Sequence, residues 1–216
     1  MWQASDAPQA MEAASSATPR TGFLPRAFDR VCSALGLLLL SPVFGIIAVV
    51  IKLDDGGSIF YTQDRVGKNF QPFRFYKFRS MVAGADRTGF ITGPADSRQT
   101  RIGYWLRRYK LDELPQLFNV LKGDMQLVGA RPEVDRYVQM FRAQYSTLLL
   151  DRPGITDPAS LAYRREDQIL SADRLEQQYV EEILPAKLHL ALEYQKRRTF
   201  RSDLGILLRT ALALLD

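Results

Sequence analysis

The run VCSALGLLLLSPVFGIIAVVI, from residue 31 to residue 51, contains no charged side chain. Its length is close to the ~20 apolar residues that a helix needs to cross a bilayer. Ser41 and Pro42 interrupt the run near its middle, where a proline removes a helix hydrogen bond and kinks the helix axis. The run therefore predicts a membrane segment that is broken at Ser41-Pro42.

Two topologies fit this membrane segment. A plain transmembrane span is the simpler interpretation of the hydropathy. However, basic residues flank the run on both sides, with Arg26 and Arg30 before it and Lys52 after it. Because basic flanks are retained on the cytoplasmic side, symmetric flanks favour a helix that enters and leaves by the same face. We expect a re-entrant helix-break-helix, whose freed backbone groups are satisfied by Ser41 or by packing against protein.

The rest of the chain predicts an α+β fold that is mainly helical. Residues 1–22 are rich in Ala, Ser, Pro and Thr and predict a disordered tail. Residues 23–53 form the expected re-entrant segment, and residues 54–216 form a small interfacial domain on the cytoplasmic face. Segments 58–63 and 73–78 alternate like strands around a turn at 66–69, which predicts a short β-hairpin.

The later part of the chain combines loops and helices. Residues 127–133 and 151–158 carry the glycines and prolines of tight loops, and each presents an arginine. From residue 167 to residue 210 the pattern is mostly helical, and Pro185 marks a new helix start.

Composition limits the kinds of chemistry. Cys32 is the only cysteine and His189 the only histidine, so an intrachain disulfide, a histidine triad and a His- or Cys-rich zinc site are excluded. The formal net charge of +5 suggests an anionic partner, which could be nucleic acid, an anionic membrane surface or a phosphorylated small molecule.

Asp112 and Glu113 are the only acidic residues between Asp96 and Asp124. The same stretch holds six basic residues: Arg98, Arg101, Arg107, Arg108, Lys110 and Lys122. Two carboxylates in a basic segment suggest phosphate chemistry. Asp112 stands where a helix N-cap would, and Gly123 follows the last apolar residue as a C-terminal glycine should. A purely structural capping role for the pair is the alternative interpretation.

Several further motifs occur in a fixed order along the chain. They are Ser41-Pro42, Gln63-Asp64-Arg65-Val66-Gly67, Tyr76-Lys77-Phe78-Arg79-Ser80-Met81, Lys110-Leu111-Asp112-Glu113-Leu114-Pro115-Gln116-Leu117, Asn119-Val120-Leu121-Lys122-Gly123-Asp124-Met125, Arg131-Pro132 and Pro153-Gly154-Ile155-Thr156. From about residue 26 to residue 210 the chain resembles the monotopic phosphoglycosyl transferases, also called bacterial sugar transferases.

The resemblance implies the reaction and its partners. Members of this family transfer a sugar phosphate from a nucleoside diphosphate sugar, usually a UDP-sugar, to polyprenol (undecaprenyl) phosphate and release nucleoside monophosphate. The resemblance places the protein among lipids of the bacterial inner membrane, at the cytoplasmic face, in the first membrane step of polysaccharide or glycoconjugate synthesis.

The resemblance also assigns residue roles. Asp112 matches the family's nucleophile, and Glu113 would hold Mg²⁺ or take the proton of the lipid phosphate. Asp112 and Glu113 are the expected Mg²⁺ ligands. The residues expected to bind substrate phosphates are Arg107, Arg131, Arg65, Lys77, Arg79 and Arg164. Chemistry agrees, because a carboxylate attacks an anionic diphosphate only when metal ions and cationic side chains neutralise the charge.

The chain departs from the family pattern at four places: Ala130-Arg131-Pro132 replaces Pro-Arg-Pro, Gln126 replaces a serine, Asp157 replaces a glycine, and Ala162-Tyr163-Arg164-Arg165 replaces an Asn-Gly-Arg-Asn-like stretch. These changes lie where the sugar and nucleotide would be held, so the sequence leaves the identity of the sugar open. It also leaves the glycan pathway and the oligomeric state open.

Two rival functions fit parts of the sequence. A membrane-anchored nucleic-acid-binding protein would use the same charge, but it explains neither the central Pro42 nor an acidic pair inside a basic segment. No nucleic-acid partner is therefore expected. A catalytically silent scaffold of the same fold is the closer rival, and intact Asp112, Glu113 and Arg131 argue against it.

Overall fold

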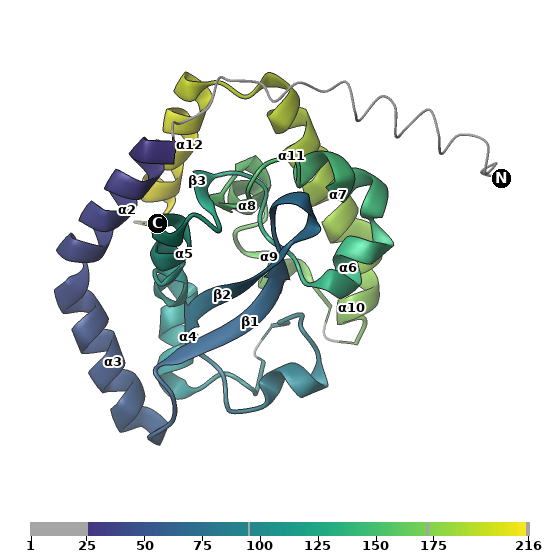
Figure 1. Cartoon of the computed structure of the whole chain (residues 1–216). Coiled ribbons are helices and arrows are strands. Elements are labelled where there is room, and N and C mark those ends of the chain that lie inside the picture. The colour runs from purple at the N-terminus through teal and green to yellow at the C-terminus, as the bar shows by residue number, and fades with distance from the viewer. Residues whose placement is uncertain (1–25, 95, 172, 215–216) are drawn as a thin grey trace.

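The computed structural model describes residues 26–94, 96–171 and 173–214 (Figure 1). The tail predicted at 1–22 lies outside these residues. Two long helices run along one side of the molecule, and a β-hairpin crosses its centre. Other helices lie behind the hairpin and on the far side, and the last helix of the chain adjoins the first of the two long helices. The helices are α2 (Arg26–Leu39), α3 (Ser41–Asp55), α4 (Arg101–Arg108), α5 (Gln116–Lys122), α6 (Asp135–Met140), α7 (Arg142–Leu148), α8 (Pro158–Ala162), α9 (Glu166–Ile169), α10 (Leu175–Gln178), α11 (Leu184–Arg197) and α12 (Phe200–Ala213), with shorter helical turns η2 (Lys68–Phe70), η3 (Ala85–Thr88), η4 (Leu111–Glu113) and η5 (Tyr179–Ile183).

Helices α2 and α3 are separated by a bend at the predicted break. They meet at an angle of 59°, and Pro42 lies in the first turn of α3, where its missing N–H costs no helix hydrogen bond. The Ser41 hydroxyl donates a hydrogen bond to the carbonyl of Leu38 at 2.8 Å. Among the described residues no single helix is long and apolar enough to cross a membrane, but this bent pair together has the length and composition to do so.

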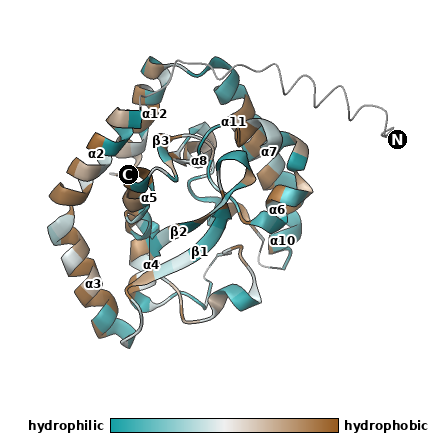
Figure 2. Ribbon diagram, in the orientation of Figure 1, coloured by the Kyte–Doolittle hydropathy of each residue, from teal (hydrophilic) through white to brown (hydrophobic). Residues whose placement is uncertain are grey.

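The bent pair keeps much of its apolar surface exposed. Figure 2 shows brown, hydrophobic residues along both helices. Leu38 and Leu39 of α2 and Leu53 of α3 are each more than two-thirds exposed. The opposite face of α3 is buried, because Ile47 and Ile51 pack in one cluster with residues of the hairpin and of α4. The helices therefore have one face on the protein and one that no described residue covers.

The end of α3 is fastened to two other elements. Asp54 Oδ2 accepts a hydrogen bond from the backbone N–H of Ile102 in α4 at 3.2 Å. Asp55 forms a two-point ion pair with Arg79, which follows the second strand of the hairpin. Arg79 also donates to the carbonyl of Ser58. These contacts fix the end of the bent pair relative to the hairpin.

The predicted β-hairpin is confirmed, with longer strands. Strands β1 (Phe60–Val66) and β2 (Pro72–Phe78) pair antiparallel in the register Phe60 opposite Phe78. Asn69, in the connecting turn, adopts a left-handed conformation (φ 53°), which asparagine tolerates better than most residues. Phe75 and Phe78 are almost fully buried and anchor the hairpin in two separate hydrophobic clusters.

The sequence did not predict a second, parallel sheet. Strands β3 (Gln126–Val128) and β4 (Gly154–Thr156) pair inside segments that were expected to be loops only. A side chain on Gly154 is impossible, because an added Cβ would lie 2.1 Å from the backbone nitrogen of Gly129. Strands of three residues give no periodic pattern, so the glycines that permit this close approach indicated turns instead.

From residue 167 to residue 210 the described chain is mostly helical, as predicted. Pro185 falls in the first turn of α11, confirming the predicted helix start. Helix α11 contributes Leu184, Leu188 and Ala191 to the largest hydrophobic cluster. The overall prediction of a mainly helical α+β fold with a short hairpin is therefore correct.

Candidate active site

Asp112 and Glu113 lie in the 3-10 turn η4, between α4 and α5. Lys110 makes the sharp turn before them with a left-handed backbone (φ 56°), an uncommon conformation for a residue other than glycine. The sequence predicted Asp112 as the N-cap of the following helix, and this is wrong: α5 begins four residues later and Pro115 occupies its N-cap position. Gly123 ends α5 in a left-handed conformation (φ 90°), as predicted.

Glu113 is surrounded by positive charge. Arg131 donates hydrogen bonds to both of its carboxylate oxygens, the one to Oε2 at 2.9 Å. Lys77 Nζ lies 3.2 Å from Oε1. Burial alone would raise the pKa of Glu113, but the charges of Arg131 and Lys77 outweigh burial and hold this pKa well below its usual range. Glu113 is therefore ionised and held in place.

Asp112 is less well compensated than its neighbour. It is only 2% exposed. Lys77 Nζ is 3.8 Å from Oδ2, while Oδ1 is buried without any hydrogen-bond partner among the described residues. Burial raises the pKa of Asp112, and the charge of Lys77 offsets only part of this effect. A buried oxygen without a partner is costly, and it is free to contact a substrate or a cation.

Lys77 and Arg131 bring three distant segments together. Lys77 projects from β2, and Arg131 lies just after β3. Burial lowers the pKa of Lys77, against the opposing charges of Glu113 and Asp112. The charge of Arg107, near the end of α4, also acts on Asp112 and Lys77. Of the residues predicted from the sequence, Lys77 and Arg131 thus contact the carboxylate pair, whereas Arg107 acts on it through its charge.

Arg65 and Arg79 are predicted phosphate-binding residues that the structure places elsewhere. Arg65 pairs with Glu133 and donates to the carbonyl of Pro132 at 3.2 Å, so it holds the loop that carries Arg131. Arg79 is held by Asp55, at the end of α3. Neither contacts Asp112 or Glu113. The structure gives Arg164, which is half-buried beyond α8, no ion pair with a described residue.

Asn119 positions Lys77, a role that the sequence motifs did not predict. It is fully buried in α5. Its amide donates to the carbonyl of Arg74 at 2.7 Å and accepts from the backbone N–H of Tyr76 at 3.1 Å. These two bonds tie α5 to β2 directly before Lys77. Asparagine is unfavourable inside a helix, and its presence in so short a helix was a usable sign of such a contact.

The donor set at the pair is compatible with a magnesium ion. Among the described residues there is no group of three or more His, Cys, Asp or Glu side chains that would form a complete metal site. Mg²⁺, however, is commonly held by one or two carboxylates together with substrate phosphates. The unpartnered Oδ1 of Asp112 fits this role, whereas both oxygens of Glu113 are engaged by cations.

Comparisons with known proteins identify the family of this chain. The model of a family described as bacterial sugar transferase matches residues 20–216. A protein of Bacillus subtilis named as a putative undecaprenyl-phosphate N-acetylgalactosaminyl 1-phosphate transferase is 39% identical over 152 residues, 70% of this chain and 81% of that protein. The UDP-N-acetylgalactosamine-undecaprenyl-phosphate N-acetylgalactosaminephosphotransferase of Aeromonas hydrophila is also 39% identical, over 68% of this chain but 36% of that protein.

A third relative carries a different sugar in its name. The UDP-glucose:undecaprenyl-phosphate glucose-1-phosphate transferase of Escherichia coli is 40% identical over 151 residues, 67% of this chain and 32% of that protein. This chain therefore spans about a third of the Aeromonas and Escherichia proteins and most of the Bacillus protein.

Proposed function

This chain belongs to the bacterial sugar transferase family of phosphoglycosyl transferases, and we propose that it transfers a phosphosugar from a UDP-sugar to undecaprenyl phosphate through a covalent intermediate on Asp112. The relatives support the acceptor, because the names of all three contain undecaprenyl phosphate. They do not choose the sugar, since both N-acetylgalactosamine and glucose occur in their names.

The proposal rests on the different partners of the two carboxylates, Asp112 and Glu113. Glu113 is fixed by Arg131 and Lys77. The Asp112 side chain is more enclosed than that of Glu113, with 3% against 17% exposure, and its Oδ1 has no described partner. A scaffold protein would gain stability by satisfying or removing such a buried oxygen. An enzyme that needs a carboxylate nucleophile keeps one unoccupied.

In the first proposed step, an oxygen of Asp112 attacks the β-phosphorus of the UDP-sugar. The bond between this phosphorus and the oxygen bridging the two phosphates breaks, and UMP leaves with that oxygen. In the second step, an oxygen of undecaprenyl phosphate attacks the same phosphorus. The bond to Asp112 then breaks, which restores the carboxylate and yields the undecaprenyl diphosphosugar.

The neighbouring residues offset the negative charge in both steps. Lys77 lies against both carboxylates, so it reduces the repulsion between Asp112 and an anionic diphosphate. Arg131, which holds Glu113, would also bind phosphate oxygens.

We further propose that Asp112, with Glu113 beside it, holds Mg²⁺ together with the substrate phosphates. When bound, this ion would neutralise phosphate charge and polarise the phosphorus–oxygen bond. The test is turnover by the detergent-solubilised protein with undecaprenyl phosphate, Mg²⁺ and a panel of UDP-sugars, scored by UMP release. We expect release with at least one sugar. No release with any common UDP-sugar would favour the scaffold, and tight, salt-sensitive oligonucleotide binding would favour the nucleic-acid-binding protein.

The bent helix pair is proposed to be re-entrant, with its apolar faces in the inner membrane and both ends on the cytoplasmic face, where UDP-sugars are made. Single cysteines introduced as Ala14→Cys and Ser97→Cys in a Cys32→Ser background test this with a membrane-impermeant thiol reagent. We expect both sites to be protected in intact cells and labelled after lysis. Labelling of position 14 in intact cells would mean a true span.

Pro42 can be tested in the same assay. Pro42→Ala should straighten the break and expose the N-terminal segment outside in a fraction of molecules, because the kink opposes crossing. An unchanged labelling pattern would mean that flanking charges and packing set the topology instead.

A further inference from the structure

Three arginines that play no part in the proposed chemistry gather at the beginning of α2. Arg26 and Arg30 are one helical turn apart on α2, so their side chains share a face. Arg152 lies in the loop before β4. We call Arg26, Arg30 and Arg152 the arginine cluster.

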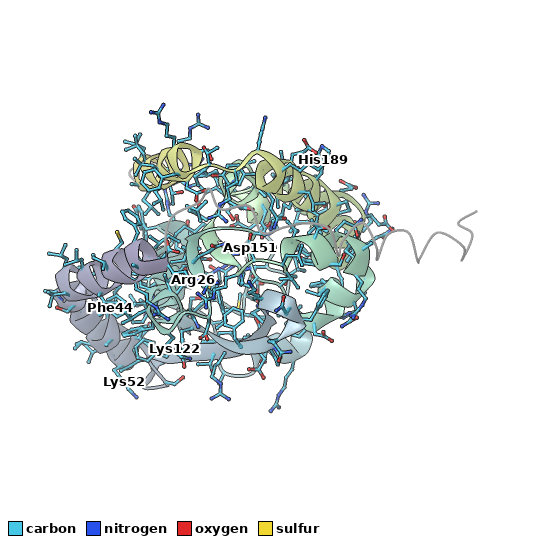
Figure 3. All side chains as sticks on the ribbon, turned by 45° about the horizontal axis from the view of Figure 1, so that its top comes forward. Arg26, Phe44, Lys52, Lys122, Asp151 and His189 are labelled. Carbon is cyan, nitrogen blue, oxygen red and sulfur yellow. The ribbon has the colours of Figure 1, made fainter. Side chains whose placement is uncertain are left out.

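The arginine cluster converges on the end of α5. A Cβ added at Gly123 would lie 3.1 Å from Nη2 of Arg30 and 3.7 Å from Nη1 of Arg152, so both guanidinium groups flank the same backbone atom. Arg26 acts on the same place, because its charge and that of Arg30 are, after burial, the main influences that lower the pKa of Arg152. Figure 3 shows Arg26 in the same part of the view as Lys122 and Asp151.

The nearby carboxylates do not neutralise this charge. Asp124 forms its ion pair with Lys122, at 3.1 Å. Asp29 is buried, and its Oδ1 has no described partner. Both acids favour the charged form of Arg152, but burial and the two other arginines outweigh them. Within the described residues, no carboxylate lies within ion-pair distance of the arginine cluster.

The position of the arginine cluster indicates its ligand. Directly after Arg30 begins the exposed apolar face of α2, with Val31 57%, Leu35 53% and Leu38 69% exposed. Long basic side chains at the end of an apolar helix face reach the headgroup layer of a bilayer. Guanidinium groups bind phosphate oxygens in a two-point geometry. A phosphodiester whose acyl chains lie along α2 would match both features.

We infer that the arginine cluster is a binding site for the phosphodiester headgroup of an anionic phospholipid, distinct from the undecaprenyl phosphate that reacts at Asp112. The bound lipid would offset the repulsion among the three arginines and fasten the start of α2 to the membrane surface. This inference concerns lipid binding and stability, so it stands or falls independently of turnover.

The test compares thermal unfolding of the purified full chain in detergent with added phosphatidylglycerol or phosphatidylcholine. We expect phosphatidylglycerol to raise the melting temperature above the phosphatidylcholine value by several degrees, and salt to reduce this difference. The double variant Arg30→Gln/Arg152→Gln should lose the difference. The matched control Arg87→Gln/Arg174→Gln removes the same charge from exposed positions and should keep it. Arg174 adjoins α10, on the side of the molecule opposite α2 in Figure 1.

Three results would overturn the inference. They are an equal effect of the two lipids on the wild type, an undiminished phosphatidylglycerol effect in the double variant, and the same stabilisation by inorganic phosphate alone, which would indicate a site for soluble anions. If the double variant does not fold in phosphatidylcholine, the exposed single variant Arg26→Gln takes its place. Native mass spectrometry then gives a second measurement, and we expect fewer retained phosphatidylglycerol molecules than in Arg174→Gln.

Discussion

Asp112 and Asp203 are both buried carboxylates, with 2% and 0% exposure, but their surroundings differ. Asp203, in α12, accepts hydrogen bonds from the Tyr194 hydroxyl at 2.7 Å and from Nε and Nη2 of Arg198 at 2.8 and 2.9 Å. Arg198 in turn donates to the carbonyl of Val128 at 2.6 Å. Asp112 has one cation at 3.8 Å and an oxygen without a described partner.

The difference separates a carboxylate that holds the fold from one that is available for chemistry. Satisfying every oxygen of a buried carboxylate compensates the cost of removing it from water. Asp203 is compensated in this way and joins α12 to β3 through Arg198. Asp112 is only partly compensated, so part of the desolvation cost persists until a substrate or cation arrives.

The strongest test of this comparison is Asp112→Asn. An amide is a poor nucleophile toward phosphorus, so turnover should fall by at least about 10⁴-fold. Labelling with radioactive UDP-sugar in the absence of lipid should mark the wild-type protein and leave the variant blank. Substantial UMP release by the variant would remove Asp112 from the nucleophile role.

The same variant should fold at least as well as the wild type. In the folded state burial raises the pKa of Asp112, so the folded protein binds this proton more tightly than the unfolded chain does. Stability from this group therefore decreases as pH rises above the unfolded pKa, and at neutral pH the ionised carboxylate is a cost. Asparagine removes that cost, and the melting temperature at pH 7 should stay equal or rise. A marked decrease would mean that Asp112 is structural.

Removal of Mg²⁺ by a chelator should likewise affect turnover at Asp112 but not the stability of the fold. With excess EDTA, turnover should fall to background and return on addition of Mg²⁺, because the free carboxylate oxygen of Asp112 and the substrate phosphates are hard ligands that suit this ion. The melting temperature of the substrate-free protein should change little, since the fold around Asp203 needs no metal. Full activity in excess chelator would contradict the proposed Mg²⁺ site.

Asp203→Ala should show the opposite behaviour. It leaves Arg198 buried beside an emptied position, so the free energy of unfolding should decrease by about 3–5 kcal/mol. The melting temperature should then fall on the order of 10 °C. Chemical denaturation measures the stability, and UMP release per folded molecule should be nearly unchanged at a temperature below the transition. A normal melting temperature with lost turnover would reverse the roles of the two aspartates.

The smallest expected effect is a shift in pH dependence on Lys77→Met. Lys77 lowers the pKa of Asp112 against the effect of burial, so removing its charge should raise that pKa further. The acid limb of kcat/KM should move to higher pH, and activity at neutral pH should decrease about tenfold. Lys68→Met, in the hairpin turn, is the control and should leave the limb in place. An unmoved limb in Lys77→Met would mean that another group controls it.

The sequence predicted the features that depend on local patterns. The break at Ser41-Pro42, the β-hairpin, the glycine at the end of α5 and the helix start at Pro185 follow from backbone rules that act within a few residues. Ordered motifs also identified the family correctly. The parallel pairing of β3 with β4 was missed, because it joins two three-residue segments across a long sequence separation.

The site was predicted in part for a related reason. Residue type suggested that any arginine near the motifs binds phosphate, but tertiary contacts decide which guanidinium groups lie beside Asp112 and Glu113. Arg65 and Arg79 pair with Glu133 and Asp55, whereas the carboxylate partner of Arg131 is Glu113 itself. The sequence also predicted Asp112 as a helix N-cap. The left-handed turn at Lys110 instead places Asp112 and Glu113 in the 3-10 turn η4, before α5 begins.

The contacts of Asp54 and Asp55 at the end of α3 also determine which acceptor lipids can reach Asp112. Arg79 forms an ion pair with Asp55 at the end of α3. Only two residues before it, Lys77 forms an ion pair with Asp112. If α2 and α3 lie in the bilayer as proposed, this short stretch of chain fixes the distance between Asp112 and the lipid tails. Only a phosphate carried at that distance meets the carboxylate. The protein would thus select acceptor lipids by the depth of their phosphate in the membrane, before any side chain contacts them.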